Sequence, residues 1–256
     1  MDGFRIHKVM KSLKVSKPVL IEGLPGIGNV GKVAADFIID SLKAKKVLEI
    51  HSYHFPHSVF INEKNLIELP IIELYHKKIK NKDFLFLAGD VQPVDEESCY
   101  KFCDTVLDIL ESYGGKEVVT LGGIGLQTIP KKPKVFVTGN DWEYVKTFRG
   151  ASNNIYGVVG PIVGVSGVLL GLAKVRKIPA ASLLAQTFGH PAYLGIKGAR
   201  EMLKILNKKF KLDLNIDKLD EEIEEIEEEI RAKTQQVMDV KAAEKTKGAK
   251  QLNYFG

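Results

Sequence analysis

Three glycines near the start of the chain, Gly26, Gly28 and Gly31, follow the spacing Gly-x-Gly-x-x-Gly. In dinucleotide-binding proteins such a loop follows a strand and opens a helix, so that backbone N–H groups approach a pyrophosphate. Glu49 lies roughly 20 residues further on, where an acid would bind a ribose hydroxyl. Asp90 follows an apolar run and could assist as an acid or bind a metal. These five residues form a candidate nucleotide-binding or phosphate-binding site.

The same loop also fits other interpretations. The stretch from Gly26 to Lys32 is a near match to the phosphate loop of NTPases, but Val33 occupies the position where Ser or Thr must bind Mg²⁺. Glycines in this order also permit a tight turn and close packing of a helix on a strand without any ligand. The pattern alone therefore leaves open a cofactor loop and a packing turn.

Other reactive residues lack the partners that chemistry requires. His51, His54 and His57 recur at three-residue steps, but residues 51 and 54 would point to opposite faces of a strand, so we expect no metal site. Cys99 and Cys103 lie one helical turn apart and are interpreted as small buried hydrophobic residues. Ser166 departs from the Gly-x-Ser-x-Gly nucleophile pattern and is expected to cap a helix. We therefore predict no catalytic residue, cofactor or metal.

Strands and helices alternate around the glycine loop, as an α/β sandwich requires. Residues 18–23 predict a buried strand, 30–42 an amphipathic helix and 46–50 the next strand, which suggests a parallel pair joined by a right-handed crossover. Residues 59–69 predict a hairpin with a polar turn. Further strands are expected at 84–89, 118–121, 135–138 and 180–184, and further helices at 95–113 (capped by Asp95), 166–175 and 192–210.

Composition excludes several classes of protein. The net charge of +5 is mild for 256 residues, and the lysines are scattered, so we expect no nucleic-acid partner. No apolar run reaches the roughly 20 residues that span a bilayer, and the first residues lack a signal pattern, so we expect no membrane association. Two cysteines exclude a disulfide framework and favour a reducing, cytoplasmic compartment.

The composition changes after the predicted core. Residues 217–240 form a helical pattern with a narrow apolar seam among glutamates. The following segment is too poor in apolar residues to fold alone, yet the chain ends in Leu252-Asn253-Tyr254-Phe255-Gly256. The sequence thus predicts a core at 1–212, an acidic helix at 213–242 and a flexible tail with a terminal aromatic motif at 243–256.

Five segments together resemble the proteasome assembly chaperone family in its archaeal branch. They occur in the expected order and cover about residues 15 to 230. The segments are Leu20-Ile21-Glu22-Gly23-Leu24-Pro25-Gly26-Ile27-Gly28-Asn29-Val30-Gly31, Gly89-Asp90-Val91-Gln92-Pro93, Thr120-Leu121-Gly122-Gly123, Gly164-Val165-Ser166-Gly167-Val168-Leu169-Leu170-Gly171 and Ala180-Ala181-Ser182-Leu183-Leu184-Ala185.

The resemblance implies a three-layer α/β/α fold with a mostly parallel sheet, similar to nucleoside-phosphorylase-like proteins. It implies no catalysis, a homo-oligomer, and binding to proteasome α subunits. Members of this kind carry a hydrophobic–tyrosine–any-residue tail that inserts between α subunits. Here Tyr254, Phe255 and Gly256 take these three places, after Leu252, and Phe255 stands where Tyr is expected.

The sequence therefore predicts a proteasome assembly chaperone that binds 20S α subunits partly through its tail. The alternative is an enzyme that binds phosphate or nucleotide at the glycine loop. A third possibility is a scaffold that oligomerises through the helix at 217–240.

Overall fold

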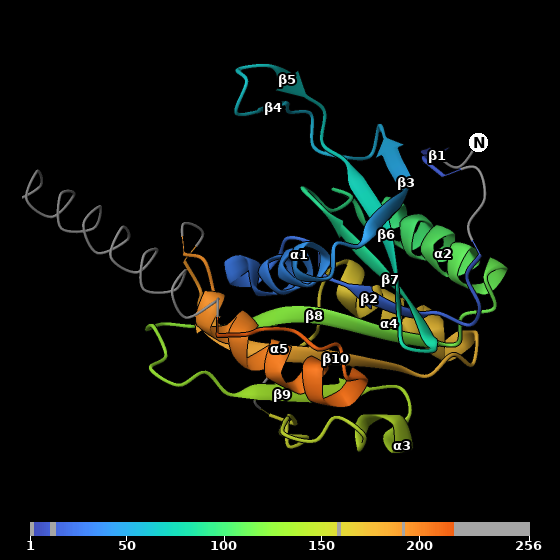
Figure 1. The fold of residues 1–256 in the computed structure, drawn as a ribbon. Coiled ribbons are helices and arrows are strands. Elements are labelled where there is room, and N and C mark those ends of the chain that lie inside the picture. The colour runs from blue at the N-terminus through green and yellow to red at the C-terminus, as the bar shows by residue number, and fades with distance from the viewer. Residues whose placement is uncertain (1–2, 11–13, 158–159, 191–192, 218–256) are drawn as a thin grey trace, which may run out of the picture. The chain divides into compact units, whose positions relative to one another are not determined.

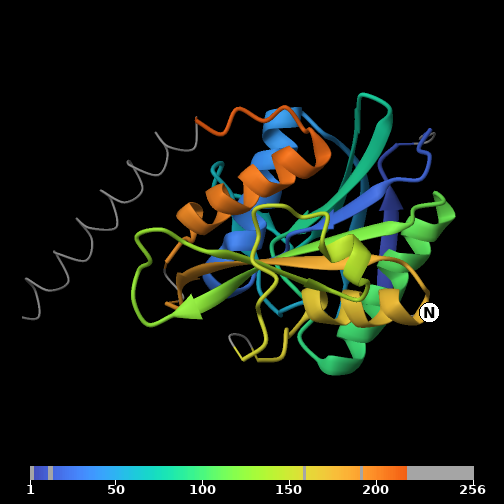
Figure 2. The same ribbon diagram turned by 90° about the horizontal axis from the view of Figure 1, so that it is seen from below.

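The computed structural model describes residues 3–10, 14–157, 160–190 and 193–217. An eight-stranded mixed sheet has helices on both faces, which confirms the predicted three-layer α/β class. Figure 2 shows α1 (Val30–Leu42) and α5 (Ile196–Phe210) on one face, with α2 (Glu96–Ser112) and α4 (Val165–Val175) on the other. The short helices are η1 (Ile27–Asn29) and α3 (Trp142–Val145).

The strands follow the spatial order β1-β3-β6-β7-β2-β8-β10-β9 (Figure 1). The centre is parallel, with β2 between β7 and β8, and β10 beside β8. The four outer pairings are antiparallel, so the sheet is more mixed than the sequence suggested. The strand bounds are β1 Phe4–Lys8, β2 Val19–Glu22, β3 Lys45–Ser52, β6 Ile72–Ile79, β7 Lys82–Gly89, β8 Glu117–Leu126, β9 Val135–Gly139 and β10 Ala180–Phe188.

The predicted parallel pair of β2 with β3 is wrong. β3 pairs with β1 and β6, and the β6–β7 hairpin separates it from β2. The two-residue turn Lys80-Asn81 closes this hairpin and brings β7, instead of β3, against β2. The crossover through α1 therefore passes over two strands, and residue 49 is carried away from the glycine loop.

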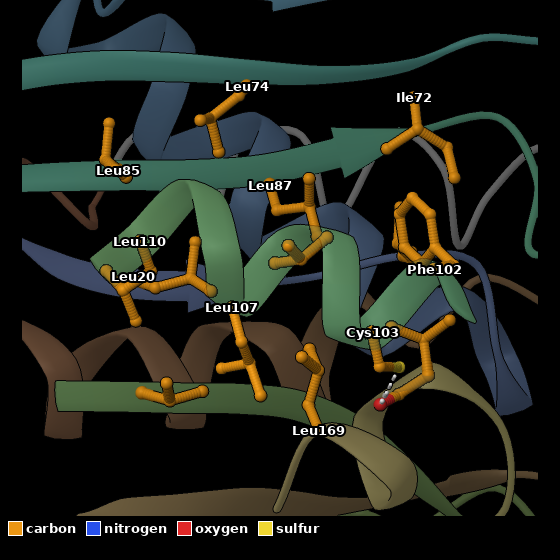
Figure 3. Packing of buried hydrophobic residues seen from close by; sticks show 14 of the residues in the cluster. Leu20, Ile72, Leu74, Leu85, Leu87, Phe102, Cys103, Leu107, Leu110 and Leu169 are labelled. Carbon is orange, nitrogen blue, oxygen red and sulfur yellow. Dashed lines mark hydrogen bonds between the residues drawn. The ribbon is translucent and has the colours of Figure 1, made fainter. Parts of the chain in front are cut away.

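The central strands are largely apolar because both of their faces are covered. Leu20 on β2 and Leu85 on β7 belong to one hydrophobic cluster with Phe102 and Leu107 of α2 (Figure 3). On the opposite face, Phe84 makes an edge-to-face contact with Phe210 of α5, with 5.5 Å between ring centroids. This two-sided packing fixes the carboxyl ends of the central strands.

Most predicted elements occur where the sequence placed them. Helix α1 covers the predicted residues, and Asp95 caps α2 by accepting a hydrogen bond from the Ser98 backbone N–H over 2.8 Å. The helix expected to begin at residue 192 begins at Ile196. The hairpin expected at residues 59–69 forms a separate two-stranded sheet of β4 (Phe60–Ile61) and β5 (Ile67–Glu68).

The described body forms one compact unit that runs to Leu214. Its last buried residues are Leu212 and Leu214, after α5. Within the described part of the chain, no helix is long and apolar enough to cross a membrane. Of the predicted acidic helix at 213–242, residues 213–217 are described and belong to no helix or strand. Residues 218–242 and the whole of the predicted tail lie outside the described residues.

Candidate functional site

The glycine loop joins β2 to α1 through the short turn η1. A Cβ atom on Gly31 would overlap the backbone carbonyl oxygen of Leu121 on β8. Only glycine therefore lets the first turn of α1 lie directly on the sheet. This contact matches the interpretation of the loop as a packing turn.

The middle of the loop is also occupied by the chain itself. Gly28 has a φ of +60°, and a Cβ there would overlap the Thr187 side chain at the end of β10. Its carbonyl oxygen accepts a hydrogen bond from the Gly195 N–H over 2.7 Å, immediately before α5. Of the three glycines in the fingerprint, Gly26 is the one at which an added Cβ would meet open space.

Glu49 does not join the glycine loop, which corrects the predicted ribose contact. It lies on β3 and forms an ion pair with Lys46, with 2.7 Å between Oε1 and Nζ. Lys46 in turn contacts Glu73 on β6 over 2.6 Å. Because β6 and β7 separate β3 from β2, the geometry of a dinucleotide site is not assembled.

Asp90 follows β7, as expected, and its side chain is exposed. Its backbone N–H donates to the Ile71 carbonyl oxygen over 3.0 Å, so the backbone here is held by the segment before β6. Two residues later, Gln92 connects two distant segments. Its Nε2 donates to the Pro25 carbonyl oxygen over 2.5 Å, and its Oε1 accepts from the Val165 N–H over 2.9 Å. Sequence reasoning missed this residue because both partners are more than 60 positions away.

Glu22 is the other residue that the sequence did not single out. It ends β2, its side chain is completely buried, and its Oε1 accepts from the Leu24 N–H over 2.9 Å. Its Oε2 accepts a hydrogen bond from the Ser166 hydroxyl over 2.9 Å. Burial raises the pKa of Glu22 to about 7, although the Leu24 and Leu121 backbone and Ser166 oppose the shift.

The predicted N-cap role of Ser166 is therefore wrong. Gly164, with a φ of +80°, precedes α4 as the capping residue, and Ser166 lies in the first turn with its hydroxyl directed at Glu22. A carboxyl with a pKa near neutrality could transfer a proton. Here the carboxyl is inaccessible and Ser166 is 9% exposed, so the pair connects α4 to the sheet without reaching a substrate.

The histidines and cysteines are the remaining reactive side chains that the sequence raised. No group of three or more potential metal ligands occurs among the side chains that the structure describes. His54 lies 3.7 Å from Asp95, while His51 and His57 line a surface groove. Cys99 and Cys103 are buried free thiols on α2, as their helical spacing indicated. The tail residues Leu252, Tyr254, Phe255 and Gly256 lie outside the described residues.

Comparison with known protein families and structures identifies the family of this chain, which the geometry of the site alone does not. The model of the PAC2 family matches residues 20–233, which include all four long helices and, except for Val19, the central strands. The chain belongs to the PAC2 family. This is the proteasome assembly chaperone family that its five segments resemble, and the membership agrees with the expectation of a non-catalytic protein.

Solved structures share this PAC2 fold over nearly the whole chain. PbaB from Pyrococcus furiosus, an archaeal proteasome activator, is 31% identical with a TM-score of 0.81, and the match covers 91% of this chain and 99% of PbaB. PbaA from the same organism, an archaeal homologue of proteasome-assembly chaperone, is 24% identical with a TM-score of 0.74 over 98% of this chain and 99% of its own. The second likeness shows the fold alone.

Among curated sequences, two uncharacterized proteins of Methanocaldococcus jannaschii are similar to this PAC2 chain. One is 29% identical over 219 residues, which cover 84% of this chain and 83% of the relative. The other is 30% identical over 210 residues, which cover 80% of each. The similarity therefore extends over the body of the protein and not over isolated motifs.

Proposed function

We propose that this PAC2 protein binds the 20S proteasome through its α subunits and acts as an assembly chaperone or activator. The main support is the 31% identity with the proteasome activator PbaB over 91% of the chain. The two buried free thiols suit a reducing compartment, so the proposal places this activity in the cytoplasm.

The proposal assigns the contact with the proteasome partly to the C-terminal tail. Leu252 and the final residues Tyr254-Phe255-Gly256 carry apolar surface at the end of a polar, lysine-rich segment. An aromatic ring supplies a large apolar surface that gains free energy when a pocket between two subunits buries it. Phe255 lacks the hydroxyl of the expected Tyr, which removes a hydrogen bond typically worth about 1 kcal/mol.

A homo-oligomer would compensate for a weak single tail. Several tails on one assembly would raise the effective concentration at a ring of repeated pockets, so overall affinity would increase without new contacts. In this arrangement the folded body holds the tails together, while the tails make the contact.

Binding of the full chain to purified α subunits, measured by native mass spectrometry and pull-down, tests the proposal. We expect a complex that is lost or strongly weakened when Leu252 to Gly256 are deleted. Asn253→Ala is the matched control, because it changes the tail outside the aromatic pair, and it should bind as the parent does. If the full chain forms no complex, the proposed function is wrong; if the deletion binds equally well, only the tail mechanism is wrong.

A further inference from the structure

An apolar hairpin, residues 59–69, stands away from the body of the molecule (Figure 1). It exposes six large apolar side chains within eleven residues, and Ile61 and Ile67, which face each other across β4 and β5, are 74% and 73% exposed. The other four are Val59, Phe60, Leu66 and Leu69. Successive strand residues point to opposite faces, so Ile61 and Ile67 share one face of the hairpin and Phe60 lies on the other. Exposed apolar surface of this kind on a folded protein typically marks an interaction site.

The turn of the apolar hairpin is ordered by hydrogen bonds of one side chain, Asn62. Asn62 accepts hydrogen bonds on Oδ1 from the Lys64 and Leu66 N–H groups, each over 3.0 Å. Its Nδ2 donates to Glu68 over 2.6 Å, and Asn65 takes a left-handed φ of +59°. The exposed side chains are therefore held in a defined arrangement, although strands of two residues are too short to be stable alone in water.

A groove of about 910 Å³ lies at the base of the hairpin, between β1, the end of β3 and the following loop. Its volume is at the upper end of the range for ordered binding pockets, roughly 300–1,000 Å³. Val59 and Leu69, at the two ends of the hairpin, are among its lining residues, so the groove adjoins the hairpin.

The groove and the hairpin have complementary chemistry. The groove contains Arg5 and the imidazoles of His7, His51 and His57, and its lining includes no carboxylate among the described residues. Glu49 Oε2 lies 3.5 Å from His7 Nδ1, outside that lining, so Arg5, His51 and His57 are the groups that a partner's carboxylates would meet. The guanidinium carbon of Arg5 lies 4.9 Å from the ring centroid of Tyr53, so the cation stacks on an aromatic side chain. The hairpin presents its apolar side chains together with the carboxylates of Glu63 and Glu68 and one ammonium group, that of Lys64.

The apolar hairpin and the groove belong to the same chain, so a second copy offers a groove for the hairpin and a hairpin for the groove. The apolar hairpin extends away from the body in Figure 1, and the groove is lined by residues at its base and on β1 and β3. We propose that the apolar hairpin of one copy docks in the Arg5–His57 groove of a second copy and that this contact builds a homo-oligomer. The inference concerns the chain alone and does not require the proteasome.

The first test compares the mass of the purified full chain with that of its variants, by sedimentation velocity and native mass spectrometry. The double variant Ile61→Glu, Ile67→Glu places two carboxylates in the centre of the contact, and we expect a smaller species and at least a tenfold rise in the dissociation concentration. Val175→Glu is the matched control, because Val175 is 77% exposed on α4 and outside the hairpin. Unchanged far-UV circular dichroism in both variants establishes that the fold is kept.

The second test identifies the occupant of the groove. A photoreactive side chain at position 66 is incorporated into a mixture of ¹⁴N- and ¹⁵N-labelled protein, and cross-links are mapped by mass spectrometry. We expect cross-links between differently labelled copies that reach residues 3–7 and 51–57. A monomeric parent protein, an oligomer that persists in the double variant, or cross-links confined to one copy or to the acidic segment 218–230 would each overturn the proposal.

Discussion

Ser166 and Glu22 are 144 positions apart, yet the serine hydroxyl donates a hydrogen bond to Glu22 Oε2 over 2.9 Å in the interior. The bond joins the first turn of α4 to the end of β2. Gln92 joins the same two regions through Pro25 and Val165. Together these side chains hold the glycine loop, the end of β7 and the start of α4 in one arrangement, at the sheet edge where open α/β folds commonly bind ligands.

Glu22 should make stability depend on pH. Its carboxyl ordinarily titrates at 4.5, but burial raises its pKa in the folded chain to about 7. Between these values the folded state keeps a proton that the unfolded state has lost. Stability therefore decreases as pH rises through this window, by roughly 3 kcal/mol if the full shift applies.

The variant Glu22→Gln removes this titration while keeping the size of the side chain. Urea unfolding at pH 4.5 to 8 should show the parent losing stability relative to Glu22→Gln as pH rises. In Ser166→Ala, which lacks the hydroxyl that favours the carboxylate, the upper end of the window should move to higher pH, while its lower end, set by the unfolded chain, stays in place. A constant difference between parent and Glu22→Gln over the whole range would refute this account.

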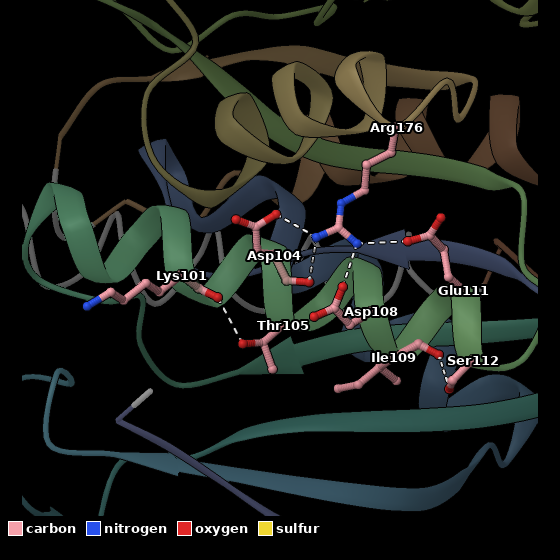
Figure 4. Close-up of polar contacts among 8 residues, drawn as sticks. All are labelled: Lys101, Asp104, Thr105, Asp108, Ile109, Glu111, Ser112 and Arg176. Carbon is pink, nitrogen blue, oxygen red and sulfur yellow. Dashed lines mark hydrogen bonds and ion pairs between the residues drawn. The ribbon is translucent and has the colours of Figure 1, made fainter. Parts of the chain in front are cut away.

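Arg176, at the end of α4, contacts three acids of α2 (Figure 4). Its guanidinium lies 2.6 Å from Asp104 and Asp108 and 2.8 Å from Glu111. Because the acids are about half exposed or more, we expect Arg176→Met to cost about 1 kcal/mol, much of it repulsion along α2. Chemical denaturation should show a loss that shrinks at high salt, whereas Lys204→Met, in an exposed pair with Glu201, should cost less than about 0.5 kcal/mol.

Gly31 should tolerate no side chain. Gly31→Ala would push a methyl group into the Leu121 carbonyl, and we expect a loss of about 3 kcal/mol or more, or failure to fold. Gly171→Ala in α4 meets open space and should stabilise by about 0.5–1 kcal/mol. Thermal melting of the two variants separates a packing role from a general effect of adding a methyl group to a helix, and equal melting temperatures would contradict it.

The glycine loop should bind no nucleotide. We expect no rise in melting temperature with NAD, NADP, ATP or nucleosides at millimolar concentration, because Gly28 and Gly31 contact the chain itself. A ligand at 100 times its Kd would add about 2.7 kcal/mol, which a melting curve detects easily. A rise that Gly26→Ala abolishes would instead support the alternative of a ligand site.

The sequence predicted correctly those helices whose formation depends on residues close together in the chain. The helices at 30–42 and 95–113 follow from the 3.6-residue apolar period and, in the second, from the Asp95 cap. Strand β6 was missed because its alternation is weak, with polar Glu73, Tyr75, His76, Lys77 and Lys78 among its residues. Its absence from the prediction is also why β3 was paired with β2.

The candidate site was harder to predict because its contacts are distant in sequence. Capping is the common local role of a serine at a helix start, but the bond from Ser166 to Glu22 replaces it here. Glu49 stood at a plausible spacing, yet strand order, which spacing does not encode, placed it beyond β7. The glycines were informative about packing, because Gly28 and Gly31 lie against Thr187 and Leu121.

Phe255 offers the sharpest test of the tail. Phe255→Tyr restores the expected hydroxyl, and one added hydrogen bond of about 1 kcal/mol should tighten binding to α subunits roughly fivefold. Phe255→Ala removes the ring and should weaken binding by tenfold or more, as loss of a buried aromatic anchor does. Asn253→Ala should leave the affinity unchanged. Surface plasmon resonance with the full chain over sparsely immobilised α rings limits the contribution of multiple tails. If the Tyr and Ala variants bind as the parent does, the ring at position 255 makes no contact with the α subunits, and binding must come from other residues of the chain.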